Sequence, residues 1–168
     1  MTRNIIFVFL LLLLSKCSFS QQKPVTMENS NPYYSKTDTN KVTVTESEWQ
    51  KILNPEVYRV ARDKGTERPG TSEFEHSKKL GTYRCKACGN ALFISDTKFD
   101  SGCGWPSFYE AISETSVIYH RDKTHGMIRT EVVCGRCDAH LGHVFDDGPP
   151  PTHKRFCING VVLDFEKK

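Results

Sequence analysis

Two Cys-x-x-Cys pairs constrain this chain more than any other feature of its sequence. Cys85 stands with Cys88, and Cys134 stands with Cys137. Two residues between thiols let a tight turn aim both sulfurs at one tetrahedral ion, and two such turns complete a four-thiolate zinc site. A filled thiolate shell leaves no position for a reactive water, so we predict a structural zinc that cross-links two distant strands.

Cys103 and Cys157 stand apart from the two pairs. If the paired cysteines bind zinc, catalytic chemistry is expected at these two lone thiols. The alternative is that the six cysteines from Cys85 onward form three disulfides, for which ~15 connectivities exist. The paired spacing favours zinc.

The N-terminal residues have the pattern of an export leader. Arg3 precedes an apolar run at residues 5–14, and small residues precede a cleavage position after Ser20. The run is too short to span a bilayer, which needs ~20 residues. We therefore predict an exported chain, periplasmic or secreted, without a stable membrane span. A lipid anchor on Cys17 is the alternative, which Lys16 disfavours.

Charge and composition limit the partners and the domain count. The formal net charge is +3 over 168 residues, and removal of residues 1–20 takes two basic side chains away. Near-neutrality predicts no nucleic-acid partner. Residues 21–43 are polar and lack an apolar period, so we predict a flexible tether before one domain at residues 44–168, and we expect a monomer.

The sequence predicts a mainly β domain that begins with two short helices. Thr45 and Asn54 are expected N-caps, with Trp49 on the buried face of the first helix, and the second helix ends before Gly65. Short β-type runs then alternate with turns, which favours an antiparallel body. The expected strands cover residues 82–85, 91–94, 116–119, 127–133 and 161–165. Asn159-Gly160 after residues 155–158 predicts a β-hairpin.

Strand alternation places Arg155 and Cys157 on the same face. A nearby cation favours thiolate, so Arg155 is a candidate activator of a nucleophilic Cys157. The alternative is a buried structural cysteine beside a solvated surface arginine.

His140 and His143 follow the second cysteine pair and could exchange protons near neutral pH. A bulge at Gly142 would turn both imidazoles to one pocket, and the alternative is that one is a ligand-like and the other a structural histidine. Cys103 lies between glycines, and Trp105 could wall an apolar pocket, although it could equally be core. No role is predicted for the other histidines, which are His76, His120, His125 and His153.

Five motifs together resemble the B-type peptide methionine-(R)-sulfoxide reductases. They are the two Cys-x-x-Cys pairs, Gly-Cys-Gly-Trp-Pro-Ser-Phe at 102–108, His-Leu-Gly-His-Val-Phe at 140–145 and Arg-Phe-Cys-Ile-Asn at 155–159. They occur in family order, and the resemblance covers about residues 44–165. It implies two antiparallel sheets in a barrel-like body, joined by zinc.

The resemblance also implies a role for each motif residue. Cys157 would be the nucleophile that takes the sulfoxide oxygen as a sulfenic acid, and Cys103 would resolve it as a disulfide. His143 would protonate or hydrogen-bond the oxygen, assisted by His140 and Asn159, and Trp105 would receive the substrate's methyl group. Oxidised peptides or proteins are the implied substrates, and a thioredoxin-like dithiol protein is the implied reductant.

Two competing hypotheses come from other functional classes. A zinc-held binding module would share the β architecture but form no sulfenic acid at Cys157. A secreted disulfide scaffold would contain three bridges and no metal. The two lone cysteines favour the enzyme, because a binding module needs neither.

Overall fold

The computed structural model describes residues 31–168. Its helices are α1 (Glu46–Ile52) and α2 (Pro55–Ala61). Its strands are β1 (Gly81–Cys85), β2 (Ala91–Ile94), β3 (Lys98–Phe99), β4 (Ser107–Phe108), β5 (Val117–Asp122), β6 (Arg129–Cys134), β7 (His140–Phe145), β8 (Arg155–Ile158) and β9 (Leu163–Lys167). The expected leader, Cys17 and the first part of the tether lie outside the described residues. Within the described part, no helix is long and apolar enough to cross a membrane.

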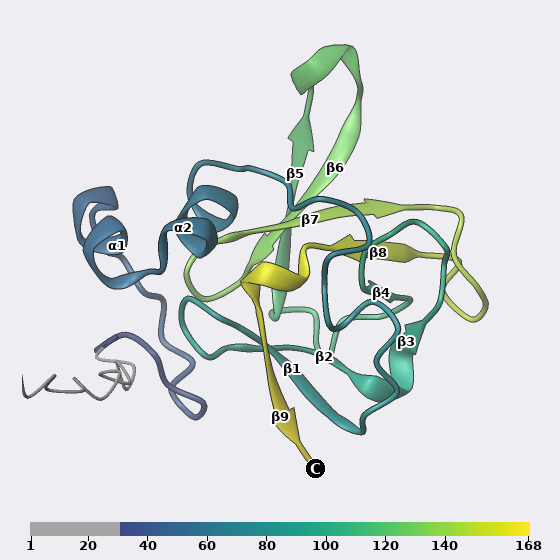
Figure 1. The fold of residues 1–168 in the computed structure, drawn as a ribbon, viewed down its shortest axis with the longest axis horizontal. Helices are drawn as coiled ribbons and strands as arrows, with labels where there is room; N and C mark the ends of the chain where they lie inside the picture. The colour runs from purple at the N-terminus through teal and green to yellow at the C-terminus, as the bar shows by residue number, and fades with distance from the viewer. Residues whose placement is uncertain (1–30) are drawn as a thin grey trace, which may run out of the picture.

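The strands form two antiparallel sheets, which confirms the predicted fold class (Figure 1). The smaller sheet has the order β2-β1-β9, and the larger has the order β3-β4-β8-β7-β6-β5. Contrary to the expected barrel-like body, the larger sheet is open: β3 and β5 stay unpaired on its two edges among the described strands. One of these edges, β3, is only two residues long.

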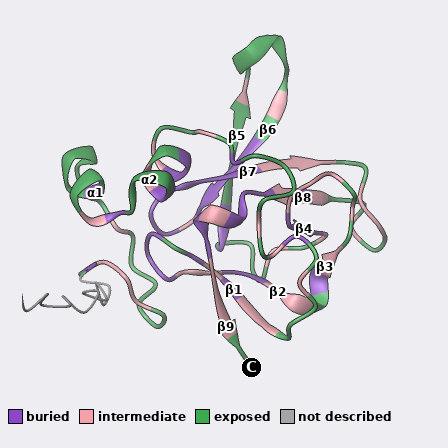
Figure 2. Cartoon of the chain, in the orientation of Figure 1, coloured by how far each residue is buried: buried purple, intermediate pink, exposed green. Residues whose placement is uncertain are grey.

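Aromatic side chains pack the two sheets against each other. Phe93 of β2 stacks on Phe108 of β4 with ring centroids 4.4 Å apart, and Tyr83 of β1 meets Phe108 edge-on at 5.0 Å. All three residues are buried. By contrast, the β5–β6 hairpin extends away from this core, and its tip is exposed (Figures 1 and 2).

Both predicted helix caps are present. Thr45 Oγ1 accepts a hydrogen bond from Glu48 N at 3.3 Å, and Asn54 Oδ1 accepts one from Glu56 N at 3.0 Å. These bonds satisfy backbone donors that the first helical turn leaves unpaired. Trp49 is buried, as its position on the apolar face predicts.

The hairpin predicted at Asn159-Gly160 does not form. β8 pairs with β4 and β7, whereas β9 pairs with β1 in the other sheet. Asn159 has a φ of −64°, and Gly160 begins a 3-10 turn instead of a type I′ turn. Glu67 explains the difference, because its backbone and carboxylate bind the Asn159 side chain and the Gly160 N–H. Tertiary bonds therefore override the local preference of the Asn-Gly pair.

Residues 31–44, which we call the N-terminal strap, contain no helix or strand but are fastened to the Cys-x-x-Cys turns. The buried Arg136, between β6 and β7, donates hydrogen bonds to three groups of the strap: Tyr33 O, Asn40 O and the Asp38 carboxylate. Ser35 N also donates to Cys88 O at 3.0 Å. The flexible tether predicted at residues 21–43 stays a prediction, and its described part, residues 31–43, makes these contacts with the domain. These contacts could not be predicted from the residues of the strap alone, because Arg136 lies about a hundred positions away from its partners in the sequence.

Candidate active site

The register of the larger sheet places a row of polar side chains on one face. Cys157 of β8 pairs with Ser107 of β4 on one side and with His143 of β7 on the other. His143 in turn pairs with Glu131 of β6. Residues directly opposite each other in antiparallel strands share a face, with Cβ atoms ~4.5–5.5 Å apart. Strand pairing alone therefore sets a thiol beside an imidazole.

Cys103, from the loop between β3 and β4, brings a second sulfur to this row. Its Sγ lies 3.3 Å from Cys157 Sγ, although the two residues are 54 positions apart. A disulfide needs an S–S distance of ~2.05 Å, so a sulfur displacement of about 1 Å would close the bond. The structure thus brings together the two lone cysteines that the sequence singled out.

The surroundings move the pKa values of these thiols in opposite directions. Burial raises the pKa of Cys157 to about 12, and the neighbouring Cys103 adds to the rise. Burial also acts to raise the pKa of Cys103, but hydrogen bonds with Ser101 and Ser107 outweigh it and lower the pKa. Cys157 therefore rests as a thiol at neutral pH.

The role of Arg155 as an activator of Cys157 stays a prediction, because the cation alone does not make Cys157 a resting thiolate. The guanidinium donates through Nε and NH2 to the two oxygens of Asp147, each at 2.8 Å, and lies 4.4 Å over the Phe145 ring. Its charge does lower the pKa of Cys157, but burial has the larger effect. The cation shares the face of the thiol, as strand alternation predicts, yet a carboxylate already neutralises it.

A bulge in β7 turns His140 and His143 to the same face. In the β6–β7 ladder, Val132 pairs with Gly142 and the next residue, Val133, pairs with His140. Leu141 therefore has no partner on β6. The two imidazole centroids are 5.5 Å apart. The bulge lies at Leu141, beside the predicted Gly142, and of the two imidazoles only His143 lines the pocket described below.

Each imidazole bonds to a carboxylate of the same sheet, His140 to one on the adjacent β6 and His143 to one on β5, the strand beyond β6. His140 Nδ1 lies 2.7 Å from Glu131 Oε1, and His143 Nε2 lies 2.7 Å from Asp122 Oδ2. Lys64 Nζ also donates to Glu131, at 2.8 Å. Burial lowers the pKa of His140, although Glu131 acts in the opposite direction. The lowered pKa means that this ring is neutral at neutral pH.

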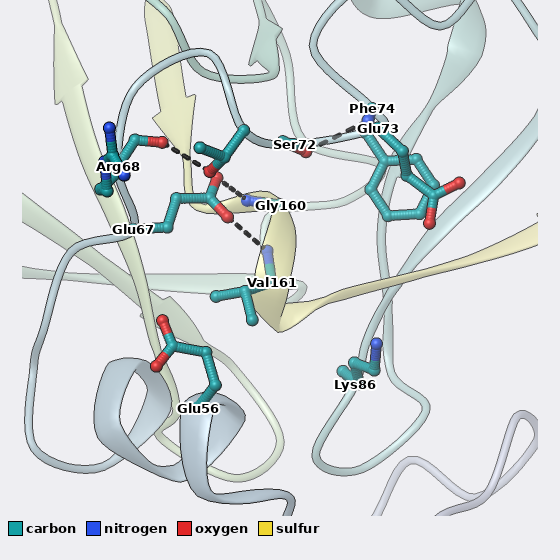
Figure 3. A pocket seen from close by; sticks show the side chains of 10 residues that line it. Glu56, Glu67, Arg68, Ser72, Glu73, Phe74, Lys86, Gly160 and Val161 are labelled. Carbon is teal, nitrogen blue, oxygen red and sulfur yellow. Dashed lines mark hydrogen bonds between the residues drawn. The ribbon is translucent and has the colours of Figure 1, made fainter.

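Glu67 connects the tryptophan and the asparagine of the predicted site. Its backbone N–H donates to Asn159 Oδ1 at 2.9 Å, and its carbonyl accepts from Trp105 Nε1 at 3.2 Å. Its carboxylate accepts from the backbone N–H groups of Gly160 and Val161, as Figure 3 shows. Asn159 Nδ2 also donates to a β7 carbonyl. The Asn159 side chain therefore ties the strands of the site together.

A pocket of about 120 Å³ lies between Cys157, His143 and Trp105. Its lining consists of Thr66, Trp105, Arg129, Gly142, His143, Phe145, Cys157 and Asn159. A larger hollow of about 390 Å³ lies beside Glu67 (Figure 3), but no cysteine or histidine is among the described residues that line it. The smaller hollow is the candidate active site, because it offers a nucleophile, an imidazole and two aromatic walls.

The four paired cysteines form a separate cluster. Their Sγ atoms all lie within 4.8 Å of one another and are buried. Cys85 ends β1 and Cys88 lies in the turn that leads to β2, whereas Cys134 ends β6 and Cys137 lies in the turn that leads to β7. The cluster could hold a metal ion, which would then join the two sheets.

The acidic residues that hold the site cannot be recognised from the sequence. Glu67, Asp122 and Glu131 stand in no motif, and their partners become neighbours only through strand register and loop packing. No local pattern marks them. Phe145 could have been assigned, because it ends the His-Leu-Gly-His-Val-Phe motif and lines the pocket.

Comparison with known proteins assigns the family. Residues 53–167 match the model of the SelR domain. The peptide methionine sulfoxide reductase MsrB of Pseudomonas putida strain W619 is 59% identical over 128 residues, which cover 76% of this chain and 96% of that protein. The chain belongs to the MsrB family. The resemblance seen in the five motifs is thereby confirmed.

Other MsrB proteins show similar identity over most of their length. MsrB of Bradyrhizobium diazoefficiens is 55% identical over 133 residues, 79% of this chain and 96% of its own. MsrB of Agrobacterium fabrum is 54% identical over 126 residues, 75% of this chain and 93% of its own. The N-terminal strap precedes the residues that match the SelR model.

Proposed function

We propose that this chain reduces methionine (R)-sulfoxide, mainly in peptides or proteins, through a sulfenic acid on Cys157 and a disulfide with Cys103. Membership of the MsrB family makes it a methionine sulfoxide reductase in protein repair. The single observation that supports this mechanism best is the 3.3 Å separation of the two sulfurs, one of which lines the pocket with His143 and Trp105.

In the first step, Cys157 attacks the sulfoxide sulfur. Its thiol proton passes to His143, which lies opposite it on β7, and His143 delivers a proton to the sulfoxide oxygen. The oxygen moves to the cysteine sulfur, and the thioether leaves. Thiol and sulfoxide thus become sulfenic acid and thioether, without another reactant.

The pocket walls support the choice of substrate. Trp105 and Phe145 provide aromatic faces for a methyl or thioether group, and the volume of about 120 Å³ suits the end of one side chain. Selection of the R epimer would follow from placing the methyl group against Trp105 while the oxygen faces His143. His140 and Asn159 would support the imidazole and the nucleophile strand.

In the second step, Cys103 attacks the sulfenic acid, water leaves and a Cys103–Cys157 disulfide forms. The lowered pKa of Cys103 favours its thiolate, the attacking species. A thioredoxin-like dithiol protein would then reduce the disulfide and be oxidised in turn.

Zinc is the metal that we propose for the four-cysteine cluster. Zn–S bonds of ~2.3 Å in a tetrahedron give S–S edges of ~3.8 Å. The Sγ atoms of Cys85 and Cys137 lie 3.7 Å apart, and those of Cys88 and Cys134 lie 3.6 Å apart, so the residues fit such an ion. Bound zinc would supply cross-linking only, because all four positions are thiolates.

We further propose that the protein works outside the cytoplasm, in the periplasm or after secretion. The support is the sequence of residues 1–20, with its basic residue, short apolar run and small residues before the cleavage position. Sequencing the N-terminus of the exported protein tests this proposal, and an intact Met1 would contradict it.

The mechanism is tested with a peptide that carries the R or the S sulfoxide. The wild-type protein should consume only R. Cys157→Ser should abolish turnover, whereas Cys103→Ser should still give about one product per active site without external thiol. Consumption of S, or equal loss in both variants, would contradict the assignment. A binding module would leave both epimers intact and form no sulfenic acid on Cys157.

A further inference from the structure

The carboxylate of Asp122, in the β5–β6 hairpin, accepts several hydrogen bonds from neighbouring residues of that hairpin. Asp122 is the last residue of β5 and pairs in register with Arg129, the first residue of β6. Arg129 NH2 donates to Asp122 Oδ2 at 2.7 Å. Thr124 donates to the other oxygen through its backbone N–H at 2.8 Å and its hydroxyl at 2.7 Å. The carboxylate therefore has one fixed orientation.

The fixed carboxylate faces the pocket imidazole. Asp122 Oδ2 also meets His143 Nε2 at 2.7 Å, and the Asp122 side chain is only 11% exposed. Hydrogen bonds from Thr124 hold the pKa of Asp122 below its ordinary value, and the bond with His143 adds to this effect. Asp122 therefore stays ionised and acts as an acceptor at any pH at which the protein would work.

We propose that Asp122 is a positioning residue of the reductase: it holds His143 by Nε2 and leaves Nδ1 as the nitrogen that exchanges protons with the substrate. The inference rests on the proposed function and deepens it. In the neutral ring, the Nε2 hydrogen donates to Asp122, so a second proton can be carried only on Nδ1. That proton goes to the sulfoxide oxygen, and Asp122 remains ionised throughout.

The neighbouring histidine shows that the arrangement is specific to His143. His140 binds its carboxylate, Glu131, through Nδ1 rather than Nε2. His143 and Arg129 line the pocket, whereas His140, Glu131 and Asp122 do not. The last residue pair of the β5–β6 ladder, next to the hairpin turn, therefore sets the orientation of the imidazole that faces Cys157.

The first test compares rates among variants. With Cys157 reduced and peptide R-sulfoxide in excess, Asp122→Ala should lower the single-turnover rate about 10- to 100-fold, part of the ~10²–10⁴ that a placed acid contributes. The sulfoxide concentration that gives half the maximal rate should change less than twofold. Asp122→Asn, which keeps an acceptor oxygen, should recover part of the rate.

Two control variants separate positioning from hairpin stability. Gly126→Ala strains the turn, because Gly126 has a φ of +71°, but leaves Asp122 and its hydrogen-bond partners in place. Asp146→Ala removes an aspartate whose side chain is 83% exposed. Both should retain the rate within about twofold. A loss in Gly126→Ala equal to that in Asp122→Ala would overturn the positioning role, as would a wild-type rate in Asp122→Ala.

The second test measures which ring nitrogen of His143 carries the proton, and it needs no substrate. Long-range ¹H–¹⁵N NMR correlations, with His143 assigned from the signals lost in His143→Gln, should show Nε2 protonated and Nδ1 unprotonated in the neutral ring. Asp122→Ala should give a mixture of both tautomers. If Asp122→Ala does not fold, the same spectra and rates are recorded for Asp122→Asn, and unchanged values in both would overturn the proposal.

The proposal can fail separately from the proposed function. A wild-type protein that leaves the R-sulfoxide intact would refute the function, whatever the NMR spectra show. A wild-type protein that consumes it, with Asp122 variants equally fast, would refute the positioning role alone.

Discussion

Gly142 of β7 lies directly against the backbone of Cys157 on β8. A Cβ added there would lie 2.0 Å from Cys157 O, a distance that no real contact reaches. Neither backbone can move away easily, because β7 and β8 are neighbours inside the larger sheet. Because Gly142 has no Cβ, β7, which carries His143, can lie at its observed distance from β8, which carries Cys157.

We expect Gly142→Ala to lower the free energy of unfolding by about 1–3 kcal/mol, a typical cost of overpacking, and to slow the single-turnover rate more than tenfold. Urea denaturation and rapid-quench kinetics measure the two effects. Gly126→Ala is the matched control, because Gly126 has a φ of +71° but open space around its position in the described structure. It should affect stability only, and an equal loss of rate there would rule out the clash as the cause.

The opposite pKa shifts of the two thiols predict an order of alkylation. In the reduced protein near pH 7.5, limiting iodoacetamide should modify Cys103 before Cys157, because the pKa of Cys103 is lowered and that of Cys157 is raised to about 12. Below that value, the Cys157 rate should rise about tenfold per pH unit, since the thiolate is the reacting form. Peptide mass spectrometry reports the order, and faster labelling of Cys157 would contradict the resting-thiol assignment.

At the scale of elements, the sequence predicted what depends on neighbouring residues. The caps at Thr45 and Asn54 and the turns of the Cys-x-x-Cys pairs are decided within a few positions, and these were right. The hairpin at Asn159-Gly160 was wrong because Glu67, which comes from the loop after α2, binds both residues. Similarly, the acidic partners of the histidines arise from β5–β6–β7 register, which no single segment encodes.

The two cysteine turns give a prediction at this scale. Cys134→Ser should prevent stoichiometric zinc binding and lower the melting temperature by about 10 °C or more, because metal binding and folding are coupled and the ion would join the two sheets. Atomic absorption and thermal unfolding in added zinc check this. Cys103→Ser, in which all four cluster sulfurs remain, should keep both the metal and the melting temperature. A full zinc content in Cys134→Ser would show that the cluster is not the binding site.

At the scale of the whole molecule, the N-terminal strap extends the domain beyond the residues shared with the family model. Sequence composition suggested only a tether, since polar residues without a period carry no folding signal of their own. The strap is held by Arg136, which its own composition does not reveal. This buried cation donates hydrogen bonds to backbone and side-chain oxygens of the strap and to Cys88 O. The strap is ordered by its contacts rather than by its own propensity.

We expect Arg136→Ala to lower the free energy of unfolding by about 2–3 kcal/mol, because buried acceptors would lose a charged donor. It should also speed cleavage within residues 31–44 by a nonspecific protease. Arg121→Ala, at an exposed position of β5, is the control and should change neither quantity. Unchanged proteolysis in Arg136→Ala would show that the strap is held by other contacts.

The two groups of sulfur atoms differ in how an oxidant can reach them. The four clustered cysteines are at most 2% exposed, whereas Cys103 and Cys157 are each only partly buried. Peroxide that diffuses to this protein therefore reaches Cys103 and Cys157 before the clustered sulfurs. If these two thiols form the disulfide of the proposed cycle, oxidative damage would fall on the sulfurs that a reductant restores, and the sulfurs that maintain the fold would be protected.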